Sequence, residues 1–324
     1  MTRSTGGART GERPRWRDVD GVVLLDKPAG PGSTTVLQHV RRLLQAAKAG
    51  HAGTLDPMAS GMLPLCFGQA TKACGVLLGS AKAYRARLRL GAATDTGDAE
   101  GRLVRQAAVP VLEPSRVATV LAAMVGPQQQ RPPMYSALKH QGRPLYELAR
   151  RGEEVERQPR PVTIHRLALL DLQEDTLDFE VVCSKGTYVR VLGEEIASAL
   201  GTEGHLVGLR RLWVEPFEPA AMVTIETIES WVAGQPPDGE VPPWLLPADA
   251  ALASLPRLDL DDLQGRHLCQ GRTVRVGPNC PSGLARTYDA SGRFLGLVEP
   301  VPGDAVRVVR LFVPGSQGPD GAPA

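Results

Sequence analysis

Residues 50–57 read Gly-His-Ala-Gly-Thr-Leu-Asp-Pro, and the predictions for the rest of the chain are built outward from this stretch. Pro57 fixes its own φ angle and lacks a backbone donor. It also pushes Asp56, the residue before it, toward extended or turn geometry. We therefore expect Asp56 to lie on a rigid, irregular loop. A carboxylate held in this way suits catalysis, although most loops rich in Gly, Asp and Pro are ordinary turns.

An amphipathic helix is predicted immediately before this loop. Ser33 suits its N-cap position. Apolar residues recur behind it at helical spacing, at Val36, Leu37, Val40, Leu43 and Leu44. The basic residues that lie off this stripe are His39, Arg41, Arg42 and Lys48. The helix should therefore present a basic surface next to the loop, and a short buried strand at residues 22–25 should precede it.

A strictly alternating segment at residues 82–90 predicts a strand with two unlike faces. One face carries Tyr84, Ala86, Leu88 and Leu90, and the other carries Arg85, Arg87 and Arg89. The arginines could contact phosphates, but a solvated strand face explains them equally well. The alternation also leaves open whether Tyr84 fills the core or lines a site.

Periodicity and turn residues predict the remaining elements. Helices are expected at residues 71–78, 114–125, 145–151 and 192–200, the last ended by Gly201. Strands are expected at residues 162–172 and 177–183, and residues 185–190 should follow in extended form. Residues 234–247 are rich in proline and predict a linker. Beyond them, short strands at residues 273–276, 283–288, 294–298 and 305–313 predict a compact β-rich module.

The composition narrows the class of protein. A chain of 324 residues with 42% hydrophobic content can form one large domain and a small one. A net charge of +2 is too small to establish a nucleic-acid partner, so the distribution of charge matters more. Five cysteines without a C-x-x-C pair predict reduced thiols and no zinc site. With neither a signal-peptide pattern nor an apolar run of transmembrane length, we expect a soluble, cytoplasmic protein.

Several common site signatures are absent from the sequence. It contains no G-x-x-x-x-G-K-[ST], no H-E-x-x-H and no G-x-S-x-G. The chemistry that remains is acid/base or covalent catalysis by a carboxylate. A carboxylate hydrolase or phosphotransferase would need a second acidic residue close to the first. Met58 stands where a D-x-D pattern would place that residue, which disfavours this class.

Five motifs together resemble the bacterial tRNA pseudouridine-55 synthases of the TruB type, in order and in separation. Besides residues 50–57, they are Leu25-Asp26-Lys27-Pro28, Lys82-Ala83-Tyr84-Arg85, Met134-Tyr135-Ser136-Ala137-Leu138-Lys139 and Ser184-Lys185-Gly186-Thr187-Tyr188-Val189-Arg190. The resemblance covers residues 19–223, and a small departure is Ala52, where bacterial members often carry threonine or valine. It implies a mixed α+β catalytic domain around an antiparallel or mixed sheet. The C-terminal module resembles a PUA-type RNA-binding domain by position and strand pattern.

The resemblance also implies an activity, the isomerisation of uridine 55 in the T arm of tRNA to pseudouridine without cofactor or metal. The target base must leave the stack before a side chain can reach its glycosidic bond. Asp56 would then act as a nucleophile or as a base at the ribose, and the sequence does not decide between them. Arg190 would keep this carboxylate ionised, although the residues alone would suggest a solvated charge at a strand end. Lys27 and Pro28 would brace the loop.

The substrate pocket follows from the same resemblance. Tyr84 would stack on the flipped uracil and assist proton removal, and Tyr188 and Leu209 would line the pocket. His51 would occupy space near the flipped nucleotide. Without the resemblance, we would assign Tyr188 and Leu209 to the core and His51 to a turn.

These expectations divide the chain into four parts. They are a disordered basic arm at residues 1–18, a catalytic domain at 19–248, a PUA-like RNA-binding domain at 249–315 and a tail at 316–324. The expected partner is the T stem-loop of tRNA, bound by a monomer. An alternative is an RNA-binding protein that helps tRNA to fold without chemistry. Binding alone has no use for a buried carboxylate, so Asp56 with Arg190 favours catalysis.

Overall fold

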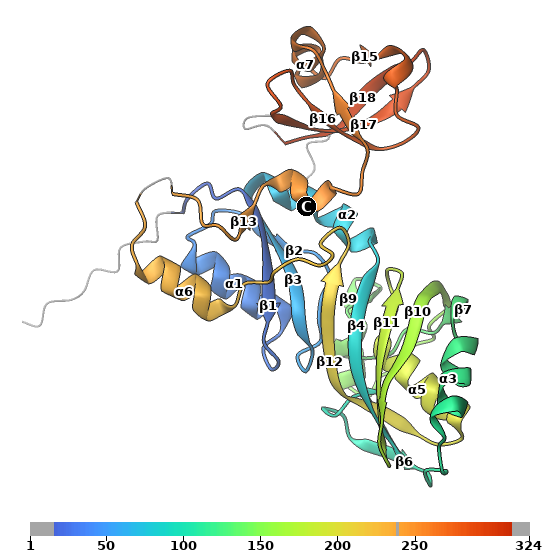
Figure 1. The fold of residues 1–324 in the computed structure, drawn as a ribbon. Coiled ribbons are helices and arrows are strands. Elements are labelled where there is room, and N and C mark those ends of the chain that lie inside the picture. The colour runs from blue at the N-terminus through green and yellow to red at the C-terminus, as the bar shows by residue number, and fades with distance from the viewer. Residues whose placement is uncertain (1–15, 238–239, 313–324) are drawn as a thin grey trace, which may run out of the picture.

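The computed structural model of the chain describes residues 16–237 and 240–312. These residues form a large mixed sheet flanked by helices, with a smaller β-rich unit beyond one end of it (Figure 1). The predicted α+β class with a small β-rich C-terminal unit is confirmed. Most of the expected basic arm and all of the expected tail lie outside the described residues. Of the arm, Arg17 lies against the end of the first helix, where its amide donates to the Gln45 carbonyl at 2.6 Å.

The large sheet has nine strands in the described part of the chain, in the order β13-β1-β3-β12-β4-β11-β10-β7, with β2 beside β3. Neighbouring strands are antiparallel, except that β3 and β12 run parallel. The strands are β1 (Gly21–Lys27), β2 (Ala49–His51), β3 (Ser60–Phe67), β4 (Lys82–Leu90), β7 (Gly126–Gln130), β10 (Arg160–Leu172), β11 (Thr176–Cys183), β12 (Gly204–Val214) and β13 (Leu245–Leu246).

Helices and short hairpins surround this sheet. The α-helices around the large sheet are α1 (Ser33–Leu43), α2 (Cys74–Gly79), α3 (Pro114–Ala123), α4 (Leu145–Arg150), α5 (Val189–Leu200) and α6 (Ile225–Ala233). Two 3₁₀ helices, η1 (Gly68–Ala73) and η2 (Ala248–Leu252), and the hairpins β5 (Ala92–Thr94) with β6 (Leu103–Gln106) and β8 (Lys139–His140) with β9 (Arg143–Pro144) complete it. Helices α3 and α5 lie side by side on the sheet, α3 on β10 and α5 on β12 and β4, and α1 lies with α6 beside β1 (Figure 1). Their apolar faces close one continuous core with the sheet.

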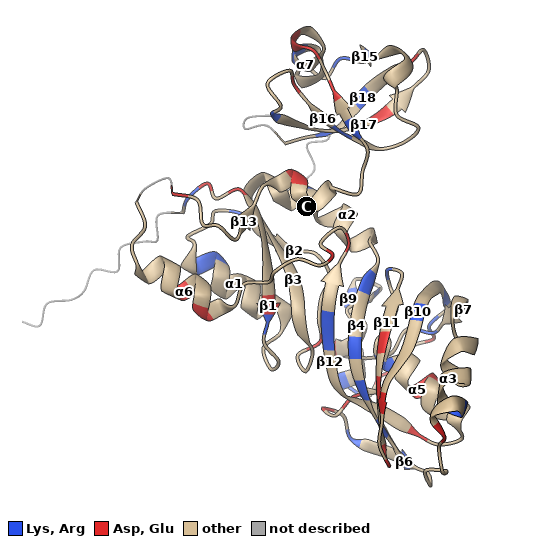
Figure 2. Cartoon of the chain, viewed as in Figure 1, with Lys and Arg blue, Asp and Glu red and all other residues tan. Residues whose placement is uncertain are grey.

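The alternation of β4 decides which side of the sheet is buried. Tyr84 and Leu88 lie in the core, whereas Arg85, Arg87 and Arg89 are exposed, as the period of two predicts. Arg87 and Arg89 form ion pairs with Asp178 and Asp175 of the neighbouring strand and turn. Figure 2 shows these opposite charges side by side on β4 and β11. Acidic neighbours therefore compensate two of the three arginines that could have contacted phosphates.

Four local predictions differ from the structure. The single helix expected at residues 71–78 is a 3₁₀ turn, η1, followed by α2. Residues 185–190 are not extended to their end, because Val189 and Arg190 form the first turn of α5. The linker at residues 234–247 contains β13, which pairs with β1. Ser33 is inside α1 and makes no cap; its hydroxyl bonds elsewhere, as described below.

The C-terminal unit is a second sheet of five strands, in the order β14-β16-β17-β18-β15. Its elements are β14 (Arg257–Asp259), α7 (Asp262–Cys269), β15 (Val274–Arg275), η3 (Gly277–Asn279), β16 (Ala285–Tyr288), β17 (Phe294–Val301) and β18 (Ala305–Leu311). Helix α7 was not predicted, although Asp261 and Gln264 form a capping box that announces it. Phe312 packs against residues of the large sheet and its helices, and Lys72 of η1 donates to the Leu311 carbonyl at 2.6 Å. The expected domain boundary between residues 248 and 249 falls inside η2, which packs on that same interface.

Candidate active site

The loop that carries Asp56 lies between β2 and β3 and is braced from below by the segment that joins β1 to α1. The Lys27 ammonium donates to the carbonyls of Ala59 at 2.7 Å, Pro28 at 2.9 Å and Pro57 at 3.3 Å. The Ser33 hydroxyl donates to the Leu55 carbonyl at 3.0 Å and accepts from the Leu55 amide at 2.8 Å. These bonds fix the loop backbone on both sides of the carboxylate. Lys27 and Pro28 thus lie under the loop and do not line the pocket above it.

Asp56 is held by a two-point ion pair with Arg190. The Arg190 Nε donates to Oδ2 at 2.8 Å, and Nη2 donates to Oδ1 at 3.3 Å. The same guanidinium donates to the carbonyls of Thr96 at 2.5 Å and Tyr135 at 2.7 Å, and Asp98 lies 3.6 Å away. The Arg190 side chain is 4% exposed, whereas Asp56 is 35% exposed and faces the pocket. The two form a charge-assisted, two-point pair in which the guanidinium is enclosed and the carboxylate is not.

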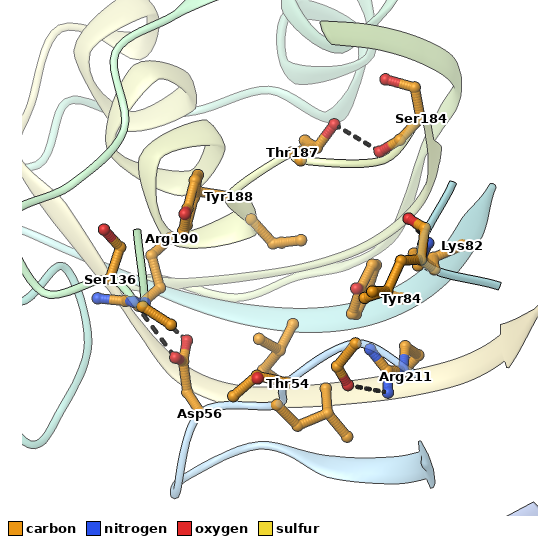
Figure 3. Close-up of a pocket in the computed structure, with 17 residues that line it drawn as sticks. Thr54, Asp56, Lys82, Tyr84, Ser136, Ser184, Thr187, Tyr188, Arg190 and Arg211 are labelled. Atoms are coloured by element: carbon orange, nitrogen blue, oxygen red, sulfur yellow. Dashed lines mark hydrogen bonds and ion pairs between the residues drawn. The ribbon is translucent and has the colours of Figure 1, made fainter. Parts of the chain in front are cut away.

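A pocket opens over this pair and collects most of the predicted site residues. It is lined by Asp56, Arg190, Tyr84, Tyr188 and Leu209, which come from four segments of the chain (Figure 3). Burial raises the pKa of both tyrosines above the ordinary value of 10, so each carries its hydroxyl proton at neutral pH. The pocket therefore combines a carboxyl group paired with arginine and aromatic and apolar walls. This combination suits a planar, uncharged ring.

His51 is the predicted pocket residue that lies outside this lining. It forms the end of β2, opposite Leu65 of β3, and its buried Nδ1 has no hydrogen-bond partner among the described residues. Burial and the nearby Arg211 lower the pKa of His51, so the ring is neutral at physiological pH. A neutral histidine at the edge of the loop can contact a ligand but adds no charge to the site.

Two cations of the pocket, Arg211 and Lys82, were missed from the sequence. Arg211 is 1% exposed and donates from Nε to the Met62 carbonyl at 2.7 Å and from Nη2 to the Gly53 carbonyl at 3.0 Å. Lys82 is also buried, and it lines the pocket next to Tyr84. The alternation of the strands contains the signal, because Lys82 shares a face with Tyr84 and Arg211 shares one with Leu209.

A buried glutamine at the end of β7 fixes Tyr188. The Tyr188 amide donates to Gln130 Oε1 at 2.8 Å, and Gln130 Nε2 donates to the Tyr188 carbonyl at 3.2 Å. Tyr188 is the residue immediately before α5, so these bonds also orient the first turn that carries Arg190. No periodicity distinguishes Gln130 within the polar run Gln128–Gln130, and sequence reasoning could not have found it.

Within residues 16–237 and 240–312, no group of three or more His, Cys, Asp or Glu side chains could hold a metal ion. In the same ranges, every helix is too short or too polar to cross a membrane.

Comparisons with protein families cover nearly all of the described chain. Residues 41–189 match the N-terminal domain of the TruB family pseudouridylate synthases. Residues 190–253 match the C-terminal domain of tRNA pseudouridylate synthase B, and residues 256–312 match the C-terminal region of pseudouridine synthase II TruB.

Two similar proteins carry the name tRNA pseudouridine synthase B. The one from Aromatoleum aromaticum is 52% identical over 287 residues, which are 89% of this chain and 91% of that protein. The one from Methylobacillus flagellatus is 48% identical over 296 residues, 91% of this chain and 96% of that protein. Among solved structures, a chain of a Cbf5-Nop10-Gar1 complex matches 91% of this chain and 85% of its own length, with a TM-score of 0.71 and 25% identity.

Proposed function

The chain belongs to the TruB family of pseudouridylate synthases, and from this premise we propose that it isomerises uridine to pseudouridine at position 55 in the T arm of tRNA. The observation that carries the catalytic assignment is the Asp56 carboxylate, which faces the pocket while Arg190 holds both of its oxygens. The second carboxylate nearby, Asp98, is buried and does not line the pocket. This supports an isomerase over a hydrolase with two acids at the substrate.

The reaction begins with a base that leaves the RNA stack and enters the pocket. The uracil ring stacks on Tyr84, with Leu209 and Tyr188 along its sides, and His51 fills the space at the loop edge. Asp56 then acts at the ribose, either by attack on C1′ or by removal of the C2′ proton. Both routes need the ionised acid that Arg190 favours.

The remaining assignments concern support and binding. Lys27 and Pro28 brace the loop, so their contribution is to the position of Asp56 and not to contact with the nucleotide. We propose that residues 249–315 are a PUA-like domain that contributes to tRNA binding. The monomer acts in the cytoplasm, without cofactor or metal.

A direct test uses an unmodified tRNA transcript and two variants. Asp56→Asn removes the negative charge and should lower the rate of pseudouridine formation in the T loop by roughly 10⁴-fold or more. Asp26→Asn is the matched control, because Asp26 forms a similar two-point pair with Arg210 outside the pocket. It should react within about 3-fold of the unmodified protein.

The outcome also separates catalysis from assisted folding of tRNA. An Asp56→Asn protein that keeps its rate contradicts the assignment of Asp56. If neither the wild type nor either variant forms pseudouridine, but the protein accelerates the refolding of tRNA, the result supports the binding alternative instead.

A further inference from the structure

The end of the pocket beside Tyr84 contains two buried cations that the steps above leave unused. Figure 3 places Arg211 and Lys82 there, away from Asp56 and Arg190. Arg211 lies opposite Tyr84 in the register of β12 and β4, so their side chains share one face of the sheet. Both cations line the pocket. Their position brings positive charge to the ring that stacks on Tyr84.

Neither of these two side chains forms an ion pair with a carboxylate within residues 16–237 and 240–312, although the more distant Glu215 favours the charge of Lys82. Lys82 donates to three main-chain carbonyls, those of Ser80 at 2.5 Å and of Leu77 and Leu78 at 3.2 Å. Arg211 donates to two main-chain carbonyls, from Nε and Nη2, and also interacts with the Tyr84 hydroxyl. Burial of unpaired charge is costly. We therefore expect the positive charge of these two side chains to act on a ligand in the pocket.

Arg211 still has donors to offer a ligand. A guanidinium carries five N–H groups, and the Met62 and Gly53 carbonyls occupy two of them. Gly53 leaves the Nη1 edge open, since a Cβ at that position would lie 3.3 Å from Nη1. Gly61 lets the backbone of Arg211 approach β3, where a Cβ would meet the Arg211 carbonyl oxygen at 2.1 Å. Gly53 thus makes room for the side chain of Arg211, and Gly61 makes room for its backbone.

We propose that Arg211, with Lys82 behind it, stabilises the negative charge that the uracil ring carries after its bond to the ribose breaks. The inference rests on the proposed function and assigns the charge-stabilising group of that reaction. Donors fixed in advance, in a site from which water is excluded, can provide the largest single contribution to such a step. Arg211 has this property because its bonds to Met62 and Gly53 hold it before substrate arrives.

The step is balanced as follows. The N1–C1′ bond breaks and its electron pair remains on the ring, which becomes an anion with charge on N1, O2 and O4. At the ribose, Asp56 either bonds to C1′ or takes the C2′ proton. The ring then turns and its C5 bonds to C1′, while the bond to Asp56 breaks or the C2′ proton returns. C5 finally loses its proton and N1 gains one, so the product is an isomer of the substrate.

The test compares two leaving rings in single-turnover reactions of the full-length protein. One T-arm RNA carries uridine at the target position, and the other carries 5-fluorouridine, whose fluorine makes the ring anion more stable by itself. The measurement is the loss of the N-linked nucleoside from nuclease digests. Arg211→Met should slow the uridine reaction by about 100-fold or more. The fold-loss of rate for the 5-fluorouridine RNA should be at least 10 times smaller than the fold-loss for the uridine RNA. The Kd for RNA should not change.

Controls separate this chemistry from a structural effect and from the proposed function. Arg210→Met removes the neighbouring guanidinium, which pairs with Asp26 and does not line the pocket, and should leave both rates unchanged. Arg211→Lys keeps the charge, so its loss of rate should be smaller than that of Arg211→Met. The loss should again be larger for the uridine RNA than for the 5-fluorouridine RNA. Equal losses for both rings in either Arg211 variant, or no loss at all, would overturn the inference. A wild-type protein that converts neither RNA would instead contradict the proposed function.

Discussion

Two aspartate–arginine pairs in this protein each have two hydrogen bonds of similar length, but their surroundings are very different. Asp26 and Arg210 meet at 2.9 and 2.7 Å, and Asp56 and Arg190 meet at 2.8 and 3.3 Å. Arg210 is 41% exposed, whereas Arg190 is 4% exposed. The Arg210 side chain makes no further hydrogen bond to the described residues, while Arg190 also binds the Thr96 and Tyr135 carbonyls.

The difference shows that bond length does not distinguish a buried ion pair at a pocket from an exposed one. An exposed pair is screened by water and contributes little. A buried pair costs desolvation, and it is retained where its charge or its position is used. In the Asp56 pair the acid faces the pocket and only the base is enclosed, so the charge is held ready on the side where a ligand enters.

The largest expected difference between the two pairs is in stability, and replacing each arginine in turn tests it. Arg190→Met should lower the free energy of unfolding by about 3 kcal/mol, because Asp56 and the buried Asp98 lose their shared cation. Arg210→Met should cost less than about 1 kcal/mol. Urea denaturation followed by circular dichroism measures both. Similar losses in the two variants would show that burial does not set the difference.

A second prediction concerns the loop on which the buried pair depends. Gly53 and Gly30 both have positive φ angles, +89° and +106°, so alanine is strained by roughly 1–2 kcal/mol at either position. Only at Gly53 would the new Cβ also press on the Arg211 guanidinium. Gly53→Ala should therefore lower the rate of pseudouridine formation by about 10- to 100-fold, and Gly30→Ala should leave it within a few-fold. Comparable rates in the two variants would argue that the contact with Arg211 is unimportant.

The smallest expected effect is a pH dependence of stability. It concerns Lys27, which supports the loop of the buried pair and has no counterpart in the exposed pair. Burial lowers the pKa of Lys27, the loop brace, from 10.5 to about 8. Between these values the unfolded chain binds a proton that the folded chain has lost, so the contribution of Lys27 to stability rises with pH. The Tm of the wild type, relative to Lys27→Met, should increase from pH 8 to pH 10. The Tm relative to Arg210→Met should not show this trend, since that variant keeps Lys27.

Much of the fold could be predicted because the sequence pattern and the burial agree. The alternation in β4 sets the buried and exposed sides of the sheet, and strands β10 and β11 were expected at nearly their observed ranges. The prediction failed where a tertiary contact decides the local structure. Leu245 and Leu246 form a strand because β1 offers an edge, and no pattern within residues 234–247 announces that partner.

The candidate site was also predicted in part, and the prediction again failed where a tertiary contact decides the role of a residue. Motif resemblance pointed to Asp56 and Arg190, and the structure places their side chains in one ion pair. The roles of these residues remain predictions until the variants are measured. Ser33 was expected to cap α1, yet its hydroxyl binds the Leu55 backbone instead. Sequence reasoning cannot distinguish such a tertiary bond from a cap, because a serine before a helix suits both.

The four-way attachment of Arg190 has a consequence for the order in which the molecule is built. Its guanidinium joins residues that are 134, 94 and 55 positions away along the chain. Contacts over such separations carry a large loop-closure entropy and are slow to form. The ability to modify RNA should therefore emerge only at the last stage of maturation, after the separate segments have met around a single side chain. In a nascent or partly denatured molecule, catalytic turnover would report the completed tertiary structure more strictly than helix content does.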